Sequence, residues 1–325
     1  MQAAQREDYN SALELAIRKA NELSLPLMVL FCIDDRVPEA NLRHYHFMLE
    51  GLWEVGQSLQ KRRIPLLFAL GETEDILEEL SPACAAVILD QGYLRWQKQT
   101  RRNIRSKLKS KRIPCLEGDT EVIVPVEIAS PKEEYSAATL RIKLLKLLPE
   151  YLAVDGSTSQ LVHAATTVLL PKPSPEKDFR YFTQMASAEE LIAWVKTGFS
   201  LDESVSPVAM FKGGHRAALA KLDGFVSEYL PRYDTLHSDP GTNFQSDLSP
   251  YLHFGQISPL QIAHGVMAAG DLKPVEIPDL IRHKALLTGL KANCAAFLEQ
   301  LIVRRELSMN FCHYNPDYDS YNSIP

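Results

Sequence analysis

The sequence predicts an α/β fold, a doubly wound parallel sheet, followed by an all-helical region. Over residues 1–125, short apolar runs alternate with amphipathic segments, which is the pattern of strands joined by helices. Single helices between successive strands imply right-handed crossovers and a parallel sheet. After residue 185 the strand signal disappears and only helix signals follow.

Four strands and four helices are expected in the first region, in alternating order. The strand candidates are Leu27–Ile33, Pro65–Leu70, Ala86–Asp90 and Ile113–Leu116. The helix candidates lie at residues 8–24, 38–62, 72–80 and 95–110. An apolar stripe of helical period supports the second of these helices, with Leu42, Tyr45, Leu49, Leu52, Val55 and Leu59. No Gly-x-Gly-x-x-Gly follows any of the strands, so a dinucleotide fingerprint is absent here.

The chain opens directly on a helix, whereas a doubly wound domain usually begins with a strand. We therefore expect a Rossmann-like domain that lacks its first strand, with Met1 just after the position of that strand. The alternative is a domain that simply starts with a helix, and both interpretations stay open.

Residues 150–185 change in character and are expected to be an interdomain linker. The stretches Asp155–Ser159 and Pro171–Pro175 are rich in Gly, Ser and Pro, which favours loop and extended chain. A capping box, Ser187-x-x-Glu190, then begins a helix, and further helices are expected at 214–230, 259–269 and 278–312. The predicted division is an α/β domain over 1–149 and a helical domain over 186–325.

Composition excludes several classes of protein. There is no apolar run long enough for a transmembrane helix and no apolar signal-peptide core, so no membrane partner is expected. The five cysteines are scattered without a Cys-x-x-Cys pair, which fits a reducing cytoplasm. With a net charge of −6, any contact with DNA needs a local basic surface. The run Arg95–Arg112 holds nine Lys or Arg and no acid, and is either such a surface or a solvated helix face.

The stretch Ser246–Ser258 is the strongest local signal for ligand binding. It contains the pair Ser249-Pro250 and ends on the serine of a second pair, Ser258-Pro259, and each pair is typical of a helix start. A helix start offers unpaired N–H groups and a partial positive charge, which suit a phosphate. The adjacent hydroxyls suggest a nucleotide diphosphate.

A second candidate site lies on the segment Phe297–Phe311. One of Arg304 and Arg305 is expected to point inward, where it needs an anion or a carboxylate. The alternative is an internal ion pair with Glu306 or Asp247. No histidine or cysteine spacing indicates a metal, so no metal site is expected, and hydrolase and NTPase motifs are absent.

Several long motifs, in order, resemble the class II DNA photolyases of the photolyase/cryptochrome family. In the second half these are Leu248-Ser-Pro-Tyr-Leu-His-Phe-Gly-Gln-Ile-Ser258, Leu301-Ile-Val-Arg-Arg-Glu-Leu307, Asn310-Phe-Cys-His-Tyr-Asn-Pro316 and Tyr318-Asp319. In the first half they are Met1-Gln-Ala-Ala-Gln-Arg, Asn10-Ser-Ala-Leu-Glu-Leu-Ala, Asp90-Gln-Gly-Tyr-Leu-Arg95 and Glu134-Tyr-Ser-Ala-Ala-Thr-Leu-Arg141. The resemblance covers essentially the whole chain.

The resemblance implies light-driven repair of cyclobutane pyrimidine dimers in UV-damaged DNA, with FAD held in a helical C-terminal domain. It also implies an N-terminal domain that in some members carries an antenna chromophore, and the residues do not decide between a deazaflavin and a folate. The family's FAD-binding stretch corresponds to Tyr233, Ser246, Leu248 and Ser249. No obligate protein partner is evident.

Two further roles follow from the resemblance. Arg305 lies on the helix that faces flavin and substrate, where a cation suits a reduced, anionic flavin. Gln300 and Arg304 are the candidates for facing the substrate. Gln300 stands where the family has a Glu that hydrogen-bonds the dimer, and an amide cannot supply a carboxylate or a proton.

Compared with the family, the chain is expected to be shortened at both ends. The family continues well beyond the Asn-Pro-x-Tyr-Asp stretch and has a strand before the segment that matches Met1. We therefore expect no intact catalytic set, weak FAD binding and little repair by this chain alone. The alternatives are a non-catalytic, cryptochrome-like protein that binds a nucleotide or a partner, and a gene remnant.

Overall fold

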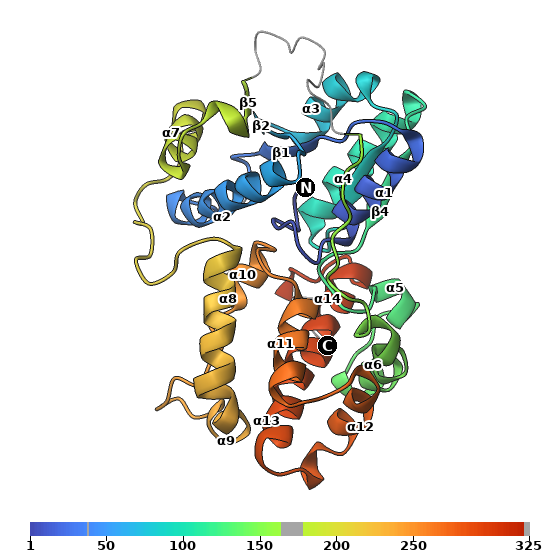
Figure 1. Ribbon diagram of the computed structural model, residues 1–325, viewed down its shortest axis with the longest axis vertical. Helices are drawn as coiled ribbons and strands as arrows, with labels where there is room; N and C mark the ends of the chain where they lie inside the picture. Colours follow the sequence, from blue (N-terminus) through green and yellow to red (C-terminus); the bar gives the residue numbers. More distant parts are fainter. Residues whose placement is uncertain (38, 164–177, 322–325) are drawn as a thin grey trace.

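The computed structural model describes residues 1–37, 39–163 and 178–321. A sheet-containing part lies above a helical part in Figure 1. The strands are β1 (Val29–Ile33), β2 (Leu66–Leu70), β3 (Val87–Asp90), β4 (Cys115–Gly118) and β5 (Phe179–Tyr181). Their helices are α1 (Ser11–Leu23), α2 (Leu42–Lys61), α3 (Thr73–Leu80), α4 (Arg95–Ser110) and α7 (Ala188–Gly198). The four predicted strands and the alternation with helices are confirmed.

The strands form two separate sheets. β1 pairs in parallel with β2, with Phe31 opposite Phe68, and β3 pairs in parallel with β4. The facing edges of β1 and β3 are not hydrogen-bonded to each other in the described residues, and an apolar cavity of about 160 Å³ lies between them. The four predicted strands therefore pair in parallel, as expected, but they form two sheets instead of one.

β5 was not predicted, because its three residues lie inside the segment expected to be a linker. It adds to β2 in the antiparallel direction, with Phe179 opposite Ala69. The rest of that linker is partly described, and the stretch Pro171–Pro175 lies outside the described residues.

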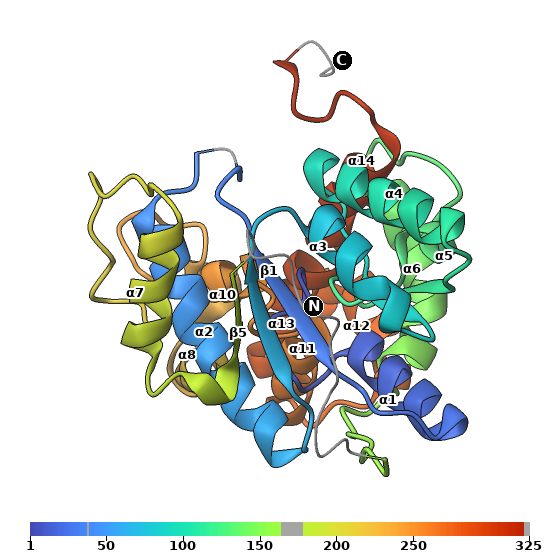
Figure 2. The same ribbon diagram turned by 90° about the horizontal axis from the view of Figure 1, so that it is seen from above.

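Helix α2 shows why the sheet-containing part folds as it does. Asn41 caps its start by accepting a hydrogen bond from the N–H of Arg43 at 3.2 Å. Its apolar stripe, Tyr45, Leu49, Leu52, Val55 and Leu59, is fully buried and packs against the sheet and α7. Two of the three tryptophans, Trp53 and Trp194, lie in this core. Figure 2 shows α2 and α7 on one side of β1 and β2, and α3 and α4 on the other.

The helical part contains shorter helices than the sequence predicted. They are α5 (Val126–Ala129), α6 (Ala137–Tyr151), α8 (His215–Gly224), α9 (Tyr233–Leu236), α10 (Ser249–His253), α11 (Pro259–Ala269), α12 (Ile277–Arg282), α13 (Gly289–Leu298) and α14 (Arg305–Tyr314). The single helix predicted over 278–312 is interrupted over residues 283–288, before α13 begins at Gly289 with a left-handed φ of 62°, and again by a π-helical segment over Glu299–Arg304. No helix in the described ranges is both long and apolar enough to cross a membrane.

Side-chain packing groups two helices differently from the predicted boundaries at 149 and 186. Leu140, Leu144 and Leu148 of α6 are buried in the core of the helical part, although α6 precedes the predicted linker. Leu191 and Trp194 of α7 are buried in the core of the sheet-containing part, although α7 follows that linker. The chain therefore crosses between the two cores three times, after β4, after α6 and after α7.

The N-terminal segment joins the two parts. The carboxylate of Asp90, at the end of β3, accepts the N–H groups of Gln2, Ala3 and Ala4 at 2.6, 2.6 and 2.9 Å. The buried guanidinium of Arg6 donates to the carbonyl oxygen of Gly255, next to α10, at 2.9 Å. These contacts fix the segment between the sheet edge and the helical part, where the candidate site lies.

Candidate functional site

A cavity of about 970 Å³ is lined by residues from both parts of the chain. All seven residues predicted for cofactor and substrate line it. They are Tyr233, Ser246, Leu248, Ser249, Gln300, Arg304 and Arg305. Folding thus brings residues up to 72 positions apart in the sequence to one site. Their spacing along the chain does not by itself indicate that they lie close together.

The first wall runs from α9 to α10. Tyr233 begins α9 and is buried, with its ring stacked on His237 at a centroid distance of 4.7 Å and edge-on to Phe297 at 5.3 Å. Leu248 is buried just before α10, whereas Ser249 is exposed to the cavity. This wall therefore combines an aromatic, apolar surface with hydroxyl groups at its edge.

The two Ser-Pro pairs begin helices as predicted, but only one of the two serines is an N-cap. Leu248 is the capping position of α10 and Ser249 is the first helical residue, so the Ser249 hydroxyl is not used in a cap. Instead, Ser246 accepts a hydrogen bond from the N–H of Leu248 at 3.4 Å. Ser258 does cap α11, by accepting from the N–H of Leu260 at 3.2 Å, but it does not line the cavity.

The opposite wall is the π-helical segment and the start of α14. Such a segment has one extra residue in its turn, and π-helical turns occur often at functional sites. Gln300 and Arg304 are exposed on it, and the Arg304 side chain has no ion pair among the described residues. Both side chains are therefore free to meet a ligand.

Arg305 points inward, as expected for one of the two arginines, but neither predicted acid pairs with it. Its guanidinium donates to the backbone carbonyl of Glu121, while Asp247 pairs with Lys221 at 3.3 Å. Burial lowers the pKa of Arg305, and the nearby carboxyl groups of Glu121 and Glu306 oppose this shift. Arginine stays protonated despite such shifts, so the cavity contains a fixed positive charge.

Glu121 is a cavity residue that sequence reasoning missed. It is 9% exposed and lines the cavity. Burial raises the pKa of its carboxyl group to about 7, although the charge of Arg305 lowers it. The carboxyl group is thus one that gains or loses a proton near neutral pH, beside the Arg305 cation.

The N-terminal half supplies the remaining polar and aromatic lining. Gln2, Tyr93, Trp96 and Gln97 line the cavity from the N-terminal segment, from the loop after β3 and from α4. Trp96 is 40% exposed and lines the cavity. The motif Asp90–Arg95 is the sequence signal that could have indicated this part of the lining, because it directly precedes α4.

The basic run Arg95–Arg112 is largely engaged within the protein. Arg101 is buried and pairs with Asp90 at 3.1 Å, and Lys107 pairs with Asp75 and Glu78, each at 2.7 Å. Arg95, Lys98, Arg105 and Lys111 also contact acidic side chains or backbone carbonyls. This favours the structural interpretation of the run over a dedicated phosphate-binding surface.

The family relationship follows from sequence comparison. Residues 1–188 match the family model described as DNA photolyase. The chain belongs to the DNA photolyase family. A deoxyribodipyrimidine photo-lyase of Methanothermobacter thermautotrophicus is 36% identical over 325 residues, which cover 100% of this chain and 63% of that relative. The enzyme of the same name from Potorous tridactylus is 31% identical over 98% of this chain and 54% of its own length.

The chain thus spans less than two thirds of the length of these family members. Solved structures show the same fold at low sequence identity. A class III photolyase from Agrobacterium tumefaciens aligns over 99% of this chain and 61% of its own, with a TM-score of 0.63 and 17% identity. A cryptochrome from Synechocystis aligns over 96% of this chain and 60% of its own, with a TM-score of 0.64 and 17% identity.

Proposed function

We propose that the 970 Å³ cavity binds FAD and serves light-driven repair of cyclobutane pyrimidine dimers in UV-damaged DNA. One observation supports this proposal above all. Seven residues chosen from the sequence for FAD and substrate line a single cavity, although they come from three separate segments. Relatives that cover the whole chain bear the name deoxyribodipyrimidine photo-lyase.

The cavity fits a flavin nucleotide in size and chemistry. Its volume is at the upper end of the roughly 300–1,000 Å³ typical of ligand and cofactor sites. Tyr233, Leu248 and Phe297 supply an apolar surface for rings, and Ser246 and Ser249 supply hydroxyl groups for phosphates. The cavity in the sheet-containing part, at about 160 Å³, is too small for an antenna chromophore by the same measure.

Each residue has a distinct task in this proposal. The hydroxyl groups of Ser246 and Ser249 donate hydrogen bonds to the diphosphate, which are stronger than neutral ones because the acceptor is charged. The Arg305 guanidinium stabilises negative charge on the ring system, since it is half-buried and oriented by the Glu121 carbonyl. Reduced FAD supplies the electron that, after excitation by light, splits the dimer.

Gln300 and Arg304 face the open side of the cavity and are proposed to contact the dimer. Arg304 is suited to a DNA phosphate, and the Gln300 amide can both donate and accept hydrogen bonds from a base. A flipped-out dimer would enter here, because a damaged, poorly stacked base pair is cheaper to extrude. The class II motifs favour cyclobutane dimers as the substrate.

FAD binding by the purified chain tests the cavity assignment. Replacing both Ser246 and Ser249 with Ala removes two hydrogen bonds to charged phosphate, worth about 1.5–3 kcal/mol each. We expect FAD affinity, measured by fluorescence titration, to fall on the order of 100-fold or more. Ser227→Ala, an exposed serine outside the cavity, is the control and should leave affinity unchanged. Equal affinities in all three proteins would contradict the assignment.

Repair is measured separately, as the light-dependent loss of dimers from an irradiated oligonucleotide. Tight FAD binding with efficient repair would show that the expected weakness of this chain is wrong. FAD binding without repair would favour the cryptochrome-like alternative, for which the Gln at position 300 is the specific observation.

A cytoplasmic location is part of the proposal. All five cysteines are free, and Cys32 and Cys294 are buried. Free thiols without disulfides are typical of proteins kept in a reducing compartment.

A further inference from the structure

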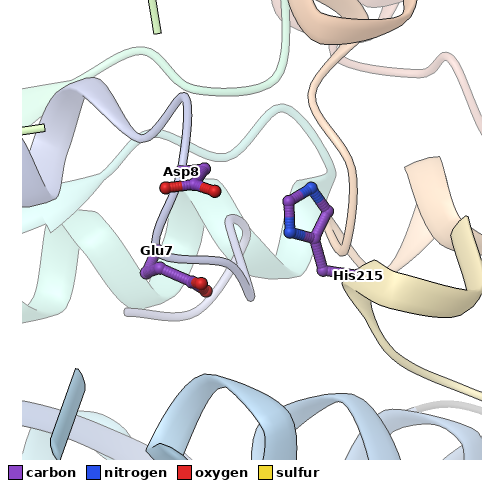
Figure 3. A group of neighbouring side chains, drawn as sticks. All are labelled: Glu7, Asp8 and His215. Atoms are coloured by element: carbon purple, nitrogen blue, oxygen red, sulfur yellow. The ribbon is translucent and has the colours of Figure 1, made fainter. Parts of the chain in front are cut away.

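We propose that Glu7, Asp8 and His215 form a binding site for a divalent transition-metal ion, with Zn²⁺ as the first candidate. Each residue offers one ligand atom, and these atoms all lie within 4.8 Å of one another. Figure 3 shows both carboxylates on the same side of the imidazole ring. The sequence predicted no metal site, because the acidic pair and the histidine are more than 200 residues apart.

The two carboxylates have no cation to balance them among the described residues. Neither Glu7 nor Asp8 forms an ion pair there, and the nearby arginines are engaged elsewhere. Arg62 pairs with Glu14 at 2.7 Å and reaches only the backbone oxygen of Glu7, at 3.3 Å. Arg6 uses its guanidinium on three backbone carbonyls. Two adjacent negative charges beside a buried residue therefore lack compensation.

A buried carboxylate oxygen without a partner points independently to a ligand. Oε2 of Glu7 is inaccessible to solvent and has no hydrogen-bond partner. Burying an ionised oxygen without a partner is costly, and native proteins largely avoid it. A metal ion between Glu7 and His215 would supply the missing partner.

The His215 ring is held in place by a hydrogen bond from the nitrogen that would not bind the metal. His215 is 6% exposed, and its Nε2 lies 2.9 Å from Oε1 of Gln261 on α11. Because Oε1 can only accept, Nε2 is the donor of this hydrogen bond, which leaves Nδ1 as the nitrogen available to a metal ion. Nδ1 makes no hydrogen bond to a described residue. A ligating histidine usually donates its other N–H to such an acceptor, which fixes the ring.

The donor set selects the kind of ion. One imidazole nitrogen and two carboxylate oxygens suit Zn²⁺ or Mn²⁺, whereas Mg²⁺ prefers an octahedral shell of oxygens. Three protein ligands leave a position for water, as in open zinc sites. The bound ion would join the loop before α1 to the first residue of α8, and so link the N-terminal segment to the helical part.

Zn²⁺ titration calorimetry on the metal-stripped chain tests the site. We expect one Zn²⁺ per chain, an affinity at least about tenfold weaker in His215→Ala and Glu7→Gln, and a loss of about 10–100-fold in Gln261→Ala. His163→Ala and Glu228→Gln, which change exposed side chains, are the matched controls and should bind as the unaltered chain does.

A melting experiment gives a readout that does not depend on one variant. Zn²⁺ should raise the Tm of the unaltered chain and of both controls, because an ion that binds only the folded state stabilises it. Zn²⁺ should not raise the Tm of Asp8→Asn. This variant replaces His215→Ala as the test of the site if His215→Ala does not fold. No Zn²⁺ binding by the unaltered chain, or equal binding by His215→Ala, would overturn the proposal.

Discussion

Asp90→Asn should be one of the most destabilising single-atom changes in this chain. The Asp90 side chain is 3% exposed, and one of its oxygens accepts three backbone N–H groups of the N-terminal segment. The other oxygen pairs with Arg101, whose side chain is 4% exposed, at 3.1 Å. Asparagine keeps the shape and one acceptor oxygen, but it turns an N–H group toward the buried guanidinium.

The expected loss in the free energy of unfolding follows from the charge of Arg101, which Asp90→Asn leaves buried without an anionic partner. Removing one partner of a buried ion pair costs about 3–5 kcal/mol, because the other charge stays buried without compensation. Changing Arg101→Met in the Asp90→Asn background should therefore recover part of the loss. The exposed pair of Asp279 and Arg282 provides the comparison, since surface pairs contribute about 0–1 kcal/mol.

Urea unfolding followed by circular dichroism measures these free energies. Asp90→Asn should lower the free energy of unfolding by several times the change in Asp279→Asn. The reasoning is refuted if the two variants lose the same amount, or if Arg101→Met worsens the Asp90→Asn variant.

Acid gives a second measurement on the same group. Burial by itself raises the pKa of Asp90, but the N-terminal amino group, Arg101 and the backbone N–H groups outweigh it and lower the pKa overall. A carboxyl group with a depressed folded-state pKa adds stability above its unfolded pKa, near 3.9, and loses it as pH falls through the folded value. Asp90→Asn should remove part of this acid sensitivity.

Two more predictions concern the junction and the buried acids. Gly255→Ala should lower the free energy of unfolding in urea by more than about 3 kcal/mol, because φ is 63° and the new Cβ would lie 1.8 Å from the Ala3 carbonyl oxygen. Gly224→Ala is the control, because a Cβ there meets open space. An equal effect of the two substitutions would contradict this account. Burial raises the pKa of Glu306 to about 8, so the folded state binds the extra proton and stability should fall as pH rises from about 4.3 to 8. Glu306→Gln should flatten this pH dependence, and an unchanged slope would show that another group, such as Glu121, causes it.

Much of the fold could be predicted from the sequence because its signals are local. The apolar stripe from Tyr45 to Leu59 sets α2, and the apolar run at β2 needs no distant partner to be recognised. β5 escaped prediction because three residues carry no periodicity, and only pairing with β2 makes them a strand. The split between β1 and β3 depends on backbone pairing, which no local pattern encodes.

The candidate site was predictable only on its helical side. Tyr233, Ser246 and Arg305 lie in motifs that the family resemblance marks. Glu121 and Gln2 are held at the cavity by hydrogen bonds to residues that are distant in the sequence. Arg305 donates to the carbonyl oxygen of Glu121, and the N–H of Gln2 donates to the carboxylate of Asp90. A local pattern cannot show which distant residue will supply such a partner.

The placement of the tryptophans makes the two cores optically distinct. Trp53 and Trp194 lie in the core of the sheet-containing part, Trp96 lies at the cavity, and the chain has no other tryptophan. Indole fluorescence therefore reports on the sheet-containing part and on whatever occupies the cavity, while the helical core is silent. A flavin bound in the cavity would lie beside Trp96, so quenching of indole fluorescence on titration with FAD would report occupancy of the cavity.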